Sequence, residues 1–105
     1  MYYDKQRWNL KTVPLADWQV LLLDAADLIE RMGLCKGDWQ SSDGFCTMGA
    51  ILETTARRAL TSDTEREAVR RLCAHIKRGN VFFWNDDKRR TKEEVVNALR
   101  GATHA

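Results

Sequence analysis

Cys46 is placed where a helix would activate a thiol, because it stands at the start of a helix predicted over residues 45–60. Unpaired N–H groups and the helix dipole at such a position stabilise a thiolate. Cysteine hydrolases of the papain type hold their nucleophile in this way, and they also need a base. His75 is the interior candidate for the base, and Asn85 or Asp86 would orient it.

The other interpretation is that Cys46 is a small buried side chain, as free cysteines usually are. We expect this second interpretation: Cys46 should pack in the core or line a site, and it should not act as a nucleophile. Cys73 lies in the apolar stripe of its helix and should be inert.

A metal site is the next possibility raised by the cysteines. Cys73 and His75 point about 200° apart on a helix, and no Cys-x-x-Cys pair occurs. The metal ligands that remain conceivable are Cys35, Cys46, His75 and Asp86. We expect no metal and no cofactor.

The second half of the chain is basic, with 12 Lys and Arg against 8 Asp and Glu in residues 53–105. Arg66 and Arg70 share one face of a predicted helix, which would suit a phosphate backbone or an acidic partner. Glu65 and Glu67 are interleaved with them, which favours an ordinary solvated surface. Nucleic-acid binding is therefore expected to be weak and is kept as an alternative.

The stretch 84–91 is the most distinctive, with the sequence WNDDKRRT. Asn85 or Asp86 can cap or tie a turn through hydrogen bonds to the backbone. Trp84 would anchor that turn in the core, and Arg90 would pair with Asp86 or the next aspartate. A structural role explains all of these residues without a ligand.

Three motifs along the chain resemble a family of small uncharacterised bacterial and phage proteins. They are Asp27-Leu28-Ile29-Glu30-Arg31-x-Gly33 with Cys35-Lys36-Gly37, Cys46-x-Met48-Gly49-Ala50-Ile51, and Trp84-Asn85-Asp86 with Arg90-Thr91-x-x-Glu94-Val95. The resemblance covers about residues 20–100 and implies no activity. It implies one constellation of residues: Cys46, Gly49, Trp84, Asn85, Asp86, Arg90 and Thr91.

The elements that must position these residues follow from apolar side chains at steps of three and four. This spacing predicts four helices, over residues 15–32, 45–60, 63–78 and 92–102. The run 81–84 is too short to assign by period, and a buried strand or an extended crossing segment would both fit it. The predicted core consists of Trp18, Leu22, Leu28, Ile29, Leu52, Val69, Leu72, Ile76, Trp84 and Leu99.

The ends of these helices carry their own signals. Pro14 suits the first turn of the first helix. Ser62 with Glu65, and Thr91 with Glu94, fit capping boxes. The segment 34–44 is rich in Gly, Ser and Asp and is expected to be a loop, in which Trp39 either folds back on the core or forms part of a site.

The length of 105 residues and a charged fraction of 30% fit one globular domain. We expect an all-α or nearly all-α, four-helix arrangement with at most two short strands. Residues 1–13 would form an N-terminal arm, 14–102 the helical body and 103–105 a tail. An odd number of cysteines and the lack of a long apolar run predict a cytoplasmic protein that does not contact membranes.

Small size, a net charge of only +2 and the lack of a nucleotide-binding loop favour a protein-interaction module. We expect a phage- or host-encoded regulator or inhibitor that acts by contact with a protein partner. The alternatives are the cysteine hydrolase and the nucleic-acid-binding protein. The residues expected to bind are Trp39, Trp84, Asn85, Asp86, Arg90, Arg66 and Arg70.

Overall fold

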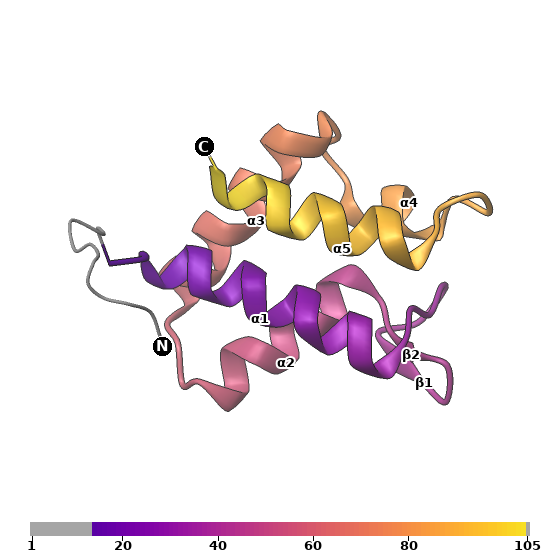
Figure 1. Ribbon diagram of the computed structural model, residues 1–105, viewed down its shortest axis with the longest axis horizontal. Helices are drawn as coiled ribbons and strands as arrows, with labels where there is room; N and C mark the ends of the chain where they lie inside the picture. The colour runs from indigo at the N-terminus through magenta and orange to yellow at the C-terminus, as the bar shows by residue number, and fades with distance from the viewer. Residues whose placement is uncertain (1–13, 105) are drawn as a thin grey trace, which may run out of the picture.

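The computed structural model describes residues 14–104, and within them the chain forms five α-helices and one small hairpin (Figure 1). The predicted all-α or nearly all-α fold is confirmed, with five helices in place of four. The predicted arm, 1–13, and Ala105 lie outside the described residues. The elements are α1 (Asp17–Met32), β1 (Gln40–Ser41), β2 (Gly44–Phe45), α2 (Thr47–Arg57), α3 (Ser62–Ile76), α4 (Val81–Asp86), α5 (Lys92–Gly101) and the 3-10 turn η1 (Ala102–His104).

Helix α1 lies at the centre of the fold and packs against α2, α3 and α5. Helix α5 runs antiparallel beside it (Figure 1). Lys92 Nζ donates to the Glu30 carbonyl at one end of this pair, and Gln19 Nε2 donates to the Thr103 carbonyl at 3.0 Å at the other. No helix within residues 14–104 has both the length and the apolar composition needed to cross a bilayer.

The predicted core is confirmed in most of its members. Trp18, Val69 and Ile76 are partly buried against it, and Leu52 is not part of it. The members that are buried as predicted are Leu22, Leu28, Ile29, Leu72, Trp84 and Leu99.

Helix α2 is rotated from its predicted phase and is shorter, since it begins after Cys46 and ends at Arg57. Leu52 was expected in the core but is 36% exposed. Thr47 takes an inward position because its amide and hydroxyl both donate to Asn85, so burying it leaves neither group unsatisfied. The buried residues of α2 are Thr47, Gly49, Ala50, Ile51 and Thr54.

The first helix starts later than its proline suggested. Pro14 lies outside α1, which begins at Asp17. The Ala16 N–H donates to Gln19 Oε1 at 2.7 Å, which is the half of a capping box that the N3 side chain supplies, while Ala16 itself has no side-chain acceptor.

Helix α3 begins and ends one or two residues away from the predicted signals. Its N-cap is Thr61, whose Oγ1 accepts from the Thr64 N–H at 3.1 Å, so the predicted Ser62–Glu65 capping box is wrong by one residue. Lys77 ends the helix in a left-handed conformation with φ 58°, which glycine adopts more easily than lysine. The Thr91–Glu94 box of α5 is confirmed by both of its hydrogen bonds.

The apolar run 81–84 belongs to helix α4 and is neither a strand nor an extended crossing segment. Asn80 caps it, since its Oδ1 accepts from the Phe83 N–H at 3.1 Å. Burial follows the helical spacing i, i+3 and i+4, at Val81, Trp84 and Asn85.

The segment 34–44 folds back onto the end of α1, and two glycines allow this approach. Gly33 and Gly44 have φ of 102° and 137°, and a Cβ on Gly44 would collide with the backbone of Gly33. The Phe45 N–H donates to the Gly33 carbonyl at 3.1 Å. This contact places the hairpin, and Trp39 before it, beside α2.

Candidate functional site

Asn85 connects α4 with two other parts of the chain. Its Oδ1 accepts from the N–H and the hydroxyl of Thr47, at 2.9 and 2.6 Å, and its Nδ2 donates to the Cys35 carbonyl at 3.1 Å and to Asp86 Oδ1 at 3.0 Å. Only 1% of Asn85 is exposed. The side chain therefore uses both of its acceptor positions and both of its donors.

Cys46 lies beside this amide and caps α2. Its Sγ accepts from the Gly49 N–H at 3.2 Å, and 2% of the residue is exposed. Burial raises the pKa of the Cys46 thiol, and the Gly49 N–H opposes this less strongly. The sequence suggested a lowered pKa at this helix start, but the loss of hydration outweighs the helix terminus here.

Asp86 fastens the loop after α1 to α4. Its Oδ1 accepts from the Gly37 N–H at 3.0 Å. Lys36 Nζ donates to the Asp87 carbonyl next to it. These contacts join two segments that lie about fifty residues apart in the sequence.

Arg90 packs against Trp84, and this corrects its expected pairing with Asp86 or Asp87. The guanidinium carbon lies 4.4 Å from the Trp84 ring centroid, and Nε donates to the Trp84 carbonyl at 2.9 Å. Its ion pair, at 3.7 Å, is with Glu94. Arg90 is therefore half-buried and holds the turn between α4 and α5.

Asn85 and Thr47 join the second and third motifs of the family resemblance. Within a motif, Cys46 accepts from Gly49, Asn85 donates to Asp86 and Arg90 packs on Trp84, while Thr91 caps α5. The signal that sequence reasoning missed is Thr47, which carries the link between the second and third motifs.

Two aromatic side chains meet above this network. The ring centroids of Trp39 and Phe82 lie 5.1 Å apart at an interplanar angle of 81°. The Trp39 carbonyl accepts from the Cys46 N–H at 3.0 Å, and a Cβ on Gly49 would collide with it. Trp39 thus sits close against α2, yet 49% of it is exposed, as is 40% of Phe82.

Three adjoining hollows surround these two rings. The first, of about 200 Å³, is lined by Gly37, Asp38, Trp39, Cys46, Phe82 and Asp86. The second, of about 290 Å³, extends from Trp39 along α2 to Leu52 and Glu53. The third, of about 230 Å³, lies between Phe82 and α3 and is lined by Met48, Val69, Cys73, Gly79, Asn80, Val81 and Phe82.

His75 lies in another part of the molecule from Cys46. It is exposed on α3 and faces Gly101 of α5, where it lines a hollow with Arg71 and His104. The structure therefore brings Cys46 and Asp86 together but not Cys46 and His75. Cys73 is partly buried against the core.

Most arginines of the second half pair with carboxylates. Arg66 pairs with Asp63, and Arg70 with Glu67 at 2.6 Å. Every such pair places a negative charge beside a basic group, which reduces the positive field. Within residues 14–104 the other pairs are Arg57–Glu53, Arg58–Asp24, Arg71–Glu67, Arg89–Asp87, Arg90–Glu94, Arg100–Asp27 and Arg100–Glu30.

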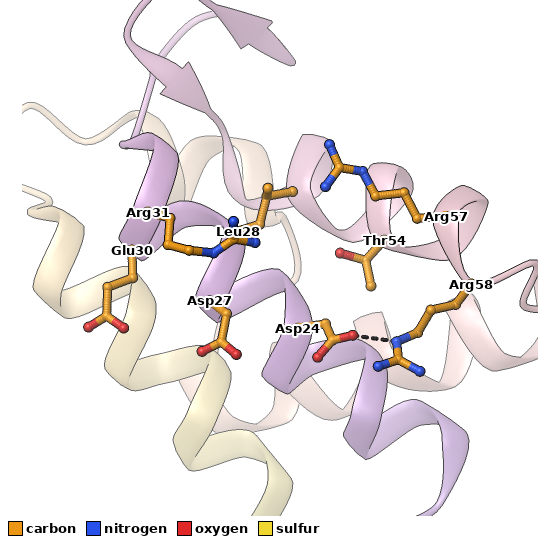
Figure 2. A pocket seen from close by; sticks show the side chains of 8 residues that line it. All are labelled: Asp24, Asp27, Leu28, Glu30, Arg31, Thr54, Arg57 and Arg58. Carbon is orange, nitrogen blue, oxygen red and sulfur yellow. Dashed lines mark hydrogen bonds and ion pairs between the residues drawn. The ribbon is translucent and has the colours of Figure 1, made fainter.

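A further hollow, of about 380 Å³, lies between α1 and α2, and sequence reasoning did not anticipate it (Figure 2). Asp24, bonded to Arg58, lines it together with the buried Thr54 (Figure 2). Its lining carries three acidic and three basic residues, so the charges balance. The lining residues are Asp24, Asp27, Leu28, Glu30, Arg31, Thr54, Arg57 and Arg58.

In the described part of the chain, no three His, Cys, Asp or Glu residues gather closely enough to hold a metal ion. The site is thus a rigid polar network under an exposed aromatic surface, carried by a small helical domain. The chain belongs to the Family of unknown function (DUF6197), whose model matches residues 15–105. No curated protein and no solved structure matches it.

Proposed function

We propose that this chain is a single-domain protein-interaction module that binds a protein partner through an aromatic face. The aromatic face consists of Trp39, Leu52 and Phe82, which line adjoining hollows. Phe83 follows Phe82 on α4 and is 79% exposed. The observation that carries the proposal is the exposure of the three large apolar side chains around one set of hollows. Contiguous apolar patches on a small monomer mark interaction sites.

The support beneath this face also suits binding. Asn85 and Asp86 tie α4 to α2 and to the loop that carries Trp39. A surface held in place before binding loses less conformational entropy when a partner docks. Tryptophan and other aromatic anchors supply much of the binding energy at protein interfaces.

The hydrolase alternative has less support. Its thiol is buried with a raised pKa, and the candidate base His75 lies in a different hollow. The nucleic-acid alternative is weakened because Arg66 and Arg70 face carboxylates on their own helix. A regulator or inhibitor needs neither chemistry, since it acts by covering a surface of its target.

Photo-cross-linking in the cells that encode the protein tests this proposal. Phe83→p-benzoylphenylalanine places the cross-linker next to Phe82 of the aromatic face, and Met32→p-benzoylphenylalanine replaces another exposed apolar residue. We expect a discrete adduct with one protein from position 83 only, and its loss when Trp39→Ser is added. Equal adducts from both positions, or none from position 83, would contradict the proposal.

A further inference from the structure

We propose that the hollow between Trp39, Phe82, Asp38 and Asp86 is a pocket for an organic cation, namely the end group of a lysine or arginine side chain of the partner. This inference rests on the proposed function, because it names the chemistry of the group that the partner inserts. The hollow is lined by these four residues together with Gly37 and Cys46.

The aromatic walls suit a cation. Trp39 and Phe82 meet edge to face at an interplanar angle of 81°, and both line the hollow. Ammonium and guanidinium groups are attracted to aromatic rings, and cages of this kind bind alkylated ammonium groups. Within residues 14–104, Trp18 and Trp84 each carry an arginine of the chain over the ring, whereas Trp39 carries none.

The charged residues that line the hollow also favour a cation. Its two charged residues, Asp38 and Asp86, are both carboxylates. Asp38 Oδ1 accepts from the Trp39 N–H at 2.9 Å, and Asp86 Oδ1 accepts from the Gly37 N–H and from Asn85 Nδ2, both at 3.0 Å. Within residues 14–104 neither carboxylate forms an ion pair, and a cation in this hollow would lie close to both negative charges.

Two basic side chains near the hollow are bound to other groups. Lys36 donates to the Asp87 carbonyl, and Arg90 lies over Trp84. The volume of about 200 Å³ is below the roughly 300–1,000 Å³ of pockets for drug-sized ligands. The space therefore fits a single side-chain end group better than a larger molecule.

Titration of the full chain with n-butylammonium and n-butylguanidinium chloride, followed by two-dimensional ¹H–¹⁵N NMR, tests the pocket. We expect saturable shifts at the Trp39 indole and at the amides of Gly37 and Asp38, at millimolar concentrations. Matched titrations with n-butanol and sodium chloride should not produce them. Shifts of the same size with n-butanol would overturn the inference.

Asparagine variants of the two aspartates remove the negative charge of the pocket while they keep the hydrogen bonds to the backbone. In Asp38→Asn with Asp86→Asn, each amide oxygen can still accept its backbone N–H, so the fold should persist while the affinity for the cation falls at least tenfold. Asp63→Asn, far out on α3, is the control and should leave the affinity unchanged. Unchanged affinity in the double variant would overturn the cation pocket.

Variants of the partner distinguish a failure of the cation pocket from a failure of the proposed function. Replacing its inserted lysine or arginine by glutamine should weaken binding to the wild-type chain at least tenfold but have little effect on the Asp38→Asn, Asp86→Asn variant. If no basic residue of the partner has this effect while Phe82→Ser still abolishes binding, the cation pocket is wrong and the aromatic face stands. If Phe82→Ser has no effect, the proposed function itself fails.

Discussion

Asn85 caps helix α2 from 38 residues away in the sequence: its Oδ1 accepts from the backbone N–H of Thr47 at 2.9 Å and from its hydroxyl at 2.6 Å. The first N–H groups of a helix have no partner within the helix, and one of them is satisfied here by a buried amide on α4. The start of α2, with Cys46, is thereby fixed beneath Trp39.

Replacing Asn85 by alanine should destabilise the fold by about 2–4 kcal/mol, because it leaves buried donors of Thr47 and the Cys35 carbonyl without partners. Urea unfolding measures this free energy. Asn97→Ala, an exposed asparagine on α5, is the matched control and should change stability by no more than about 0.5 kcal/mol. Equal effects of the two variants would show that the Asn85 network does not stabilise the fold.

Replacing Leu72 by alanine should destabilise the fold much more than replacing Leu52, although both are leucines on amphipathic helices. Leu72 is fully buried, and Leu72→Ala should cost about 2–5 kcal/mol. Leu52 is 36% exposed, and Leu52→Ala should cost about 1 kcal/mol. A larger cost at Leu52 than at Leu72 in thermal or urea unfolding would contradict the phase of α2.

Cys46 should react slowly with iodoacetamide at pH 7, because burial raises the pKa of its thiol and keeps it protonated. Labelling mapped by mass spectrometry should show Cys46 protected in the folded protein and reactive in urea, with no change in His75→Ala. Fast labelling at pH 6 that His75→Ala abolishes would instead establish an activated Cys–His pair.

The same pKa shift has a consequence for stability. Below the pKa of an unfolded cysteine, about 8.5, the thiol is neutral in both states and its contribution to stability is fully present. As the pH rises above that value the unfolded chain ionises first, so stability falls. Cys46→Ser should reduce this loss between pH 8 and 10, measured by urea unfolding, relative to the wild type.

Binding to duplex DNA should be weak, with a Kd no tighter than about 10⁻⁶ M at physiological salt and a steep salt dependence. The reason is that most arginines of the second half have carboxylate partners on the surface. Fluorescence anisotropy with two unrelated duplexes measures this. Tight binding to one duplex only would favour the nucleic-acid alternative.

The sequence allowed most of the helices to be predicted, because local signals govern them. The apolar stripe of α1 places Leu22, Leu28 and Ile29 in the core, and the capping box at Thr91 and Glu94 forms as its spacing suggests. These features depend on residues within about one turn of each other, which a linear pattern records.

The phase of α2 could not be predicted in the same way. Leu52 is more apolar than Thr47, so an apolar stripe selects it, yet Thr47 is the buried residue. Its burial depends on Asn85, 38 residues further along the chain. The pattern around Thr47 contains no sign of that partner.

The candidate site was predicted in part. Trp84 is buried as expected, but Asn85 and Asp86 bond remote segments of the chain and do not tie a turn within their own stretch. Arg90 packs on Trp84 and does not pair with an aspartate. That Trp39 forms part of a site stays a prediction. The contact of Trp39 with Phe82 joins a loop to α4 and could not be predicted, since the run 81–84 had no assigned structure. The alternative that paired Cys46 with His75 could not be tested from the sequence either, because spacing does not place helices in space, and the two residues line different hollows.

The most direct test of the account is the affinity of the purified chain for the protein recovered by cross-linking at position 83, measured by isothermal titration calorimetry with the wild type and with Trp39→Ala. Interface tryptophans commonly contribute about 2 kcal/mol or more, so we predict a Kd at least tenfold weaker for Trp39→Ala and unchanged for Met32→Ala. Equal affinities of the wild type and Trp39→Ala would contradict the claim that this protein acts through its aromatic face.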